Sequence, residues 1–207
     1  MFLNRPLQDY LDELASAQPT PGGGAAAAMS GALAAALASM VARLTIGRDD
    51  YAAVQPEIAG LLQQTEQLRA IFQQLVQEDS DAYATLARTF KLPRGTAEEK
   101  TARAQAVQAA LAQAALVPLD VAERAATLLR LCQRIAEIGN ASVLSDIATA
   151  AALATGAATG AAWMVRTNLH SLKDPATVEA LSSRLGEALD QIMERGQIIT
   201  GIVGERA

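Results

Sequence analysis

Apolar residues recur every three to four positions along most of the chain, and no stretch alternates between apolar and polar residues at every second position. A spacing of three to four is typical of an α-helix with one buried face, whereas strict alternation is typical of a β-strand. Glycine, proline and asparagine interrupt the helical spacing at widely separated points. We therefore predict an all-α protein.

The interruptions divide the chain into about seven helices, and we treat residues 1–207 as a single-domain helical bundle. Thr96, with acidic residues directly after it, has the features of a helix N-cap. Pro118 removes one helical hydrogen bond and is expected to interrupt or kink the run in which it lies. The predicted helical runs cover residues 6–16, 24–46, 56–90, 96–138 with the break at Pro118, 142–170 and 177–203.

Two of the predicted helices, 24–46 and 142–170, are rich in alanine. Ten of the eighteen residues from 25 to 42 are alanine, and so are nine of the fifteen from 148 to 162. Alanine favours helix, and small side chains at one-turn spacing, such as Gly156 and Gly160, allow helix backbones to come close together. We expect these to be central helices packed at short distance. A substrate groove floored by small side chains is also compatible with the pattern.

Residues 24–46 are apolar over a length that would span a membrane. Alanine contributes little to membrane insertion, however, and Arg43 lies near the end of the run. We therefore expect a buried helix of a soluble protein and no membrane partner. The first fifteen residues carry acidic side chains and lack the apolar region of a signal peptide, so we expect a cytoplasmic location.

Composition excludes several classes of function. The net charge is −5 and no window is rich in lysine or arginine, which argues against a nucleic-acid partner. Cys132 is the only cysteine and His170 the only histidine, so neither an intrachain disulfide nor a zinc site of thiolate and imidazole is expected. Cys132 stands among leucines and is interpreted as a core thiol. We predict no metal site.

Five parts of the chain, in order, resemble one known family. They are PGGGAAAAMSGALAAALASMVARLTIGRDDY (21–51), EDSDAY (78–83) with KLP (91–93), VPLDVAE (117–123), GNASVLSD (139–146) and MVRTNL (164–169). Together they resemble the formiminotetrahydrofolate cyclodeaminase/methenyltetrahydrofolate cyclohydrolase family over nearly the whole length. Two positions depart from the family pattern: Ala25 stands where serine is common, and Met164 stands where the last motif opens with asparagine.

The resemblance implies an all-α bundle that forms a homodimer and acts on one-carbon derivatives of tetrahydrofolate, with no cofactor beyond the folate substrate. Stand-alone bacterial members are often cyclohydrolases that open 5,10-methenyltetrahydrofolate to 10-formyltetrahydrofolate. Members fused to a formiminotransferase domain are cyclodeaminases that release ammonia. Because this chain lacks that second domain, cyclohydrolase activity is favoured. The departures at Ala25 and Met164 also leave open a non-catalytic folate-binding helical dimer.

The methenyl group is a delocalised cation, so a nearby carboxylate would stabilise it and take a proton from the attacking water. Asp79 matches the acid of the family, and it lies in EDSD, where aspartate and serine are unusual for a helix interior. Asp81 and Asp146 are further candidates, Asp81 for substrate binding and Asp146 for catalysis. For each acid the alternative is structural: a solvated face for the first two, and a favourable interaction with a helix N-terminus for Asp146.

Candidate substrate-binding residues follow partly from chemistry and partly from the resemblance. Three glycines before an alanine-rich helix expose backbone N–H groups that suit an anion. Asp146 and Asn168 lie on one predicted helix, 22 residues and therefore about 33 Å apart, so both touch one ligand only if it is long or supplied by two subunits. For the candidates other than the glycines, the alternative is a structural role in helix capping or core packing, or a plain surface position. The candidates are Gly22, Gly23, Gly24, Arg43, Thr45, Tyr51, Asp81, Asn140, Arg166 and Asn168.

Overall fold

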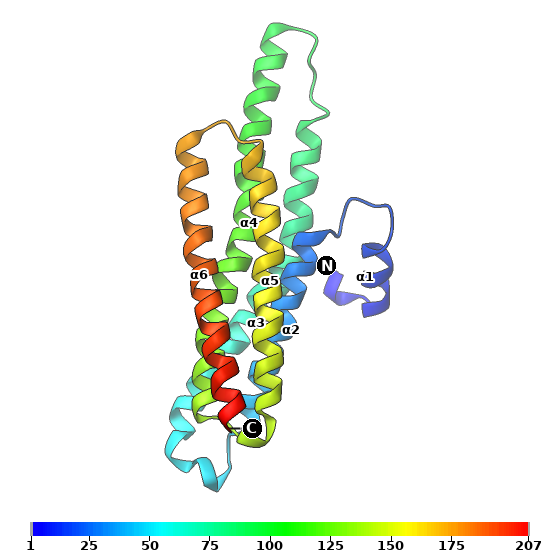
Figure 1. The fold of residues 1–207 in the computed structure, drawn as a ribbon. Coiled ribbons are helices and arrows are strands. Elements are labelled where there is room, and N and C mark those ends of the chain that lie inside the picture. The colour runs from blue at the N-terminus through cyan, green and yellow to red at the C-terminus, as the bar shows by residue number, and fades with distance from the viewer. Residues whose placement is uncertain (1, 207) are drawn as a thin grey trace.

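The computed structural model describes residues 2–206, which form six α-helices and three short 3₁₀-helices without a β-strand (Figure 1). The prediction of an all-α protein is confirmed, and the predicted helix ends lie within three residues of the observed ones except where Pro118 was expected to divide a helix. The α-helices are α1 (Leu7–Leu14), α2 (Gly23–Arg43), α3 (Gln55–Thr89), α4 (Ala97–Ile138), α5 (Leu144–His170) and α6 (Pro175–Arg206). The 3₁₀-helices are η1 (Phe2–Asn4), η2 (Asp49–Val54) and η3 (Ala141–Val143).

The prediction of about seven helices is wrong because α4 continues through Pro118 as one helix of 42 residues. A proline removes one N–H donor from a helix interior. Pro118 is buried in a stretch of α4 with many other buried side chains, and this packing outweighs the loss of one hydrogen bond. The predicted start of the helix is confirmed, since Glu99 N–H donates to Thr96 Oγ1 (3.2 Å) and Thr96 N–H donates to Glu99 Oε2 (3.1 Å).

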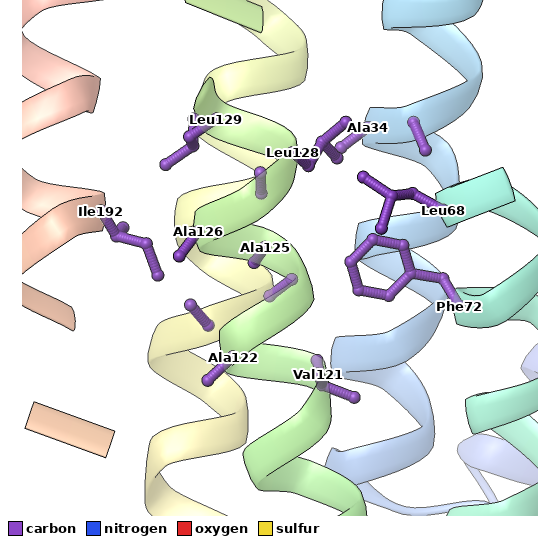
Figure 2. Close-up of a cluster of buried hydrophobic side chains, with 14 of the residues drawn as sticks. Ala34, Leu68, Phe72, Val121, Ala122, Ala125, Ala126, Leu128, Leu129 and Ile192 are labelled. Carbon is purple, nitrogen blue, oxygen red and sulfur yellow. The ribbon is translucent and has the colours of Figure 1, made fainter. Parts of the chain in front are cut away.

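Small residues bring the central helices close together, as predicted. A Cβ atom placed on Gly160 of α5 would lie 3.6 Å from the Cβ of Ala27 in α2, and one on Gly31 would lie 2.5 Å from the ring of Phe72 in α3. Figure 2 shows Phe72 and Leu68 directed into the space between α2 and α4. All six α-helices contribute side chains to the main hydrophobic core.

The two ends of helix α2 lie in different surroundings. Its 21 residues span about 30 Å. Its first residues lie beside α1 and the second half of α3, whereas its last residues lead into η2 at the opposite end of the bundle (Figure 1). α5 runs antiparallel to α2, because Gly23 approaches Met164 and Gly160 approaches Ala27.

The helices α2 and α5 also share an outward surface without charge. No charged residue occurs between 23 and 42 or between 147 and 165, and Leu33, Met40 and Trp163 are exposed. We call this surface the α2/α5 face. By length and composition both helices could cross a membrane, but the core helices of globular proteins share these properties. In α2, 61% of the most apolar 18-residue window is buried. In the helix that ends at His170, 39% of the corresponding window is buried.

Candidate active site

A pocket of about 340 Å³ lies at the start of α2. The loop before α2, the first turn of α2, the second half of α3, the middle of α4 and the end of α5 contribute to its wall. The lining residues are Pro19, Thr20, Gly22, Gly23, Gly24, Asp79, Ala82, Tyr83, Leu86, Leu111, Ala114, Met164, Thr167, Asn168 and Ser171. The three predicted glycines, Asp79 and Asn168 are therefore brought together by the fold.

The glycine run allows a carboxylate from another helix to reach the first turn of α2. Gly22 is the N-cap residue and has no side chain to accept hydrogen bonds from that turn. Asp79 takes this position instead, and the backbone amide of Ala25 acts as a hydrogen-bond donor toward its carboxylate. A Cβ atom on Gly24 would lie 2.0 Å from Asp79 Oδ1, so any larger residue at position 24 would displace the carboxylate.

The environment of Asp79 favours acid–base chemistry. Burial raises the pKa of its carboxyl group, and the backbone amide of Ala25 opposes this effect without cancelling it. Among the described residues that line the pocket, Asp79 is the only carboxylic acid. A carboxyl group with a raised pKa in a concave site suits a general base or general acid near neutral pH.

Asn168 and an apolar wall complete the pocket. The Asn168 side chain donates from Nδ2 to the carbonyl oxygens of Ala114 (3.2 Å) and Met164 (3.0 Å), so its Oδ1 is the atom left to accept a hydrogen bond from a ligand. Tyr83 supplies the only aromatic ring among the described lining residues. Tyr83 was not predicted, although it follows Asp79 by four residues and therefore shares its face of α3.

A second group of predicted site residues lies at the other end of α2. The backbone N–H of Asn140 donates to Thr45 Oγ1 (3.0 Å), the Asn140 Nδ2 donates to Leu44 O (3.1 Å), and Ala141 N–H donates to the Tyr51 hydroxyl (3.0 Å).

Gln55 Nε2 adds hydrogen bonds to the carbonyl oxygens of Thr45 and Tyr51. We call Thr45, Tyr51, Gln55 and Asn140 the turn network. It fastens the turn between α4 and α5 to the segment that follows α2. The binding roles of Thr45, Tyr51 and Asn140 stay predictions, but their hydrogen bonds favour a structural role.

Asp146 is also remote from the pocket. It lies in the first turn of α5, and Asn168 lies in the last, which confirms that one helix carries both. Asp79 and Asp146 therefore do not meet in one chain. Asp81 is exposed, accepts a hydrogen bond from Gln77 Nε2 (3.1 Å) and does not line the pocket.

The two arginine candidates have protein partners. Arg166 is exposed and lies over the ring of Trp163, with 5.4 Å between its guanidinium carbon and the ring centroid. Arg43 forms an ion pair with Glu66 at 3.4 Å. Neither lines the pocket, and their binding roles stay predictions. Cys132 is fully buried, which raises the pKa of its thiol to about 12, and its interpretation as a core thiol is confirmed.

The fold and this pocket define a class of protein: a helical bundle whose site combines the N-terminus of a central helix with a half-buried carboxyl group. Residues 6–187 match the family model described as formiminotransferase-cyclodeaminase. The chain belongs to that family.

Relatives and a solved structure agree with this assignment. The chain is 38% identical to a methenyltetrahydrofolate cyclohydrolase of Methylorubrum extorquens, over 94% of this chain and 92% of the relative. It is 35% identical to the formimidoyltransferase-cyclodeaminase of Mus musculus, over 99% of this chain but only 38% of that longer protein. The crystal structure of formiminotetrahydrofolate cyclodeaminase from Thermotoga maritima superposes with a TM-score of 0.90 at 28% identity, covering 99% of this chain and 98% of that one.

Proposed function

We propose that this protein is an enzyme of folate one-carbon metabolism that hydrolyses 5,10-methenyltetrahydrofolate to 10-formyltetrahydrofolate. The observation that carries the proposal is the half-buried Asp79 carboxyl group, held at the N-terminus of α2 inside a pocket. The Methylorubrum extorquens relative, which matches over nearly its whole length, bears the name of this activity. The proposal includes no cofactor beyond the folate substrate.

Asp79 acts as the general base in the proposed reaction. The Asp79 carboxylate accepts a proton as water adds to the carbon between N5 and N10, which forms a neutral tetrahedral adduct. The bond from that carbon to N5 then breaks, Asp79 returns the proton to N5, and the adduct hydroxyl loses its proton to solvent as the formyl carbonyl forms. The balance is one cation plus water giving 10-formyltetrahydrofolate plus one proton. A general base of this kind contributes about 10²–10⁴-fold in rate.

The rest of the pocket binds and orients the folate. The N-terminus of α2 offers partial positive charge to a carbonyl oxygen or carboxylate of the substrate. Tyr83 and the leucines of α3 and α4 supply apolar surface for its rings. Asn168 Oδ1 accepts a hydrogen bond from the amine side of the pterin.

The test replaces the acid without changing its size. We expect Asp79→Asn to lower kcat/KM by tenfold or more, because an amide cannot accept the proton. Loss of methenyl absorbance measures the reaction. Glu78→Gln is the matched control, since Glu78 is the neighbouring carboxylate on α3 and does not line the pocket. Unchanged turnover in Asp79→Asn would contradict the assignment of Asp79 as the general base.

Cyclodeaminase activity is the second candidate, supported by the names of the Mus musculus relative and the Thermotoga maritima structure. In that reaction Asp79 would deliver a proton to departing ammonia. Ammonia release from 5-formiminotetrahydrofolate distinguishes it from the hydrolase. Binding of folate without turnover of either substrate would instead identify a non-catalytic folate-binding dimer.

We propose a homodimer that buries the α2/α5 face, in the cytoplasm and without a membrane or nucleic-acid partner. Exposed Leu33 and Trp163, on stretches of α2 and α5 that carry no charged residue, favour a covered interface. Leu33→Glu should yield monomers in light scattering after size exclusion. Leu7→Glu is the control, because Leu7 is also exposed but lies on α1. A dimer that survives Leu33→Glu would contradict this interface.

A further inference from the structure

Two buried hydroxyl groups next to the pocket have no hydrogen-bond partner. Tyr10 of α1 is only 4% exposed, and its hydroxyl oxygen is buried without a donor or acceptor among the described residues. The Ser80 hydroxyl is in the same situation, and Ser80 directly follows Asp79 on α3. A buried polar group without a partner is unusual in a folded protein.

Contacts from η1 and α1 hold Tyr10 in place beside α3. The backbone N–H of Phe2 donates to Gln77 Oε1 (3.3 Å), two residues before Asp79. The rings of Phe2 and Tyr10 meet edge to face with their centroids 5.8 Å apart. Burial raises the pKa of the Tyr10 hydroxyl, and the charge of Asp79 raises it further.

We propose that Tyr10 is a positioning residue for Asp79: its hydroxyl donates a hydrogen bond to one bridging water molecule, which donates to the carboxylate, from outside the pocket. Tyr10 does not line the pocket, so it acts through Asp79 and not on the substrate. Tyr10 and the Asp79 carboxylate are the two polar partners that such a water needs. The inference rests on the proposed function, because it assigns Tyr10 a part in placing the general base.

The proposed hydrogen bond would both orient the Asp79 carboxylate and change its pKa. A hydrogen bond to the charged form of an acid lowers its pKa, so the Tyr10 donor opposes the effect of burial on Asp79. The titratable groups near Asp79 are Tyr10 from α1 and Tyr83, which lines the same pocket one turn along α3. α2, α4 and α5 contribute no titratable side chain to the pocket wall.

The experiment measures kcat/KM against pH for wild type, Tyr10→Phe and Phe2→Leu. Tyr10→Phe removes only the hydroxyl group, and the ring keeps its packing. We expect the acidic limb of the profile to move upward by about one pH unit in Tyr10→Phe, with activity close to wild type at high pH. Phe2→Leu loosens the packing against Tyr10 but leaves the hydroxyl, so its limb should move by less than that of Tyr10→Phe. An unmoved limb in Tyr10→Phe, or a larger shift in Phe2→Leu than in Tyr10→Phe, would overturn the inference.

A second measurement does not depend on turnover. Carbon-13 NMR of labelled aspartate carboxyl groups, with the Asp79 signal assigned by its loss in Asp79→Asn, reports the titration of Asp79 directly. A higher midpoint in Tyr10→Phe alone supports the positioning role even if the wild type turns over neither folate, a result that overturns only the proposed function. Equal midpoints in wild type and Tyr10→Phe overturn the positioning role, whatever the activity.

Discussion

The two ends of α2 carry similar polar residues but use them differently. At the C-terminal end, Asn140 N–H pairs with Thr45 Oγ1 and Ala141 N–H pairs with the Tyr51 hydroxyl, so buried polar groups satisfy one another. At the N-terminal end, Asp79 is half-buried with a raised pKa, and the Tyr10 hydroxyl has no partner among the described residues. Paired groups hold a fold together, whereas under-paired groups beside a pocket cost stability and remain free for chemistry.

The largest expected effect is at the pocket end, where Gly24→Ala should break the arrangement. The new Cβ atom would lie 2.0 Å from Asp79 Oδ1, so the carboxylate must move. We expect kcat/KM for the methenyl substrate to fall about 100-fold, the scale of a misplaced general base. The helix should persist, because alanine favours helix over glycine.

Gly22→Ala is the matched control for this prediction. A Cβ atom there would have its nearest neighbour, Pro19 O, at 3.6 Å, an ordinary contact. We expect a much smaller loss of activity. Equal losses in the two variants would show that the glycines act through the loop as a whole and not through the position of Asp79.

The second-largest effect is expected in the turn network, at the C-terminal end of α2, and it concerns the free energy of unfolding. Thr45→Val keeps the shape of the side chain but removes the oxygen that accepts from the buried Asn140 N–H. We expect the free energy of unfolding to fall by about 2 kcal/mol, the cost of a buried donor without a partner. Urea denaturation measures it. Unchanged stability with weakened folate binding would instead support the binding role predicted for Thr45.

The smallest expected effect concerns the free energy of unfolding, which the charged Asp79 carboxylate lowers. Because the folded protein raises the pKa of Asp79 above its unfolded value, folding favours the protonated form, and stability is lost as pH rises through the folded pKa. Asp79→Asn is permanently neutral. We expect it to unfold at higher urea concentration than wild type at pH 8, with the difference shrinking toward pH 4. A wild type that is the more stable at pH 8 would contradict this.

Much of the fold could be predicted from the sequence, because local signals mark helix ends. The capping pair of Thr96 and Glu99 and the glycine run before α2 both stand at observed helix starts. The exception is Pro118. A proline has a known local cost, but the compensating burial comes from other helices and is not visible in the local pattern.

The site could be predicted only in part, for a related reason. Asp79, the three glycines and Asn168 meet in one pocket, as their common resemblance to a family suggested. Motif order along the chain does not reveal which end of a helix a motif will reach, so Thr45, Tyr51 and Asn140 were grouped with them although they lie at the other end. The sequence did not indicate a positioning role for Tyr10, because an aromatic residue on an apolar helix face is typical of core packing.

In the proposed mechanism, the contact between Asp79 and the first turn of α2 ties a helix end to the catalytic cycle. A cap normally comes from the residue that precedes the helix, but here it comes from 55 residues further along the chain, the separation of Gly24 and Asp79. In the proposed reaction the same carboxylate contacts the first turn of α2 and takes a proton from water. A protonated carboxyl group is a weaker acceptor for the amide of Ala25, so the proposal implies that the pocket wall loosens briefly in each turnover.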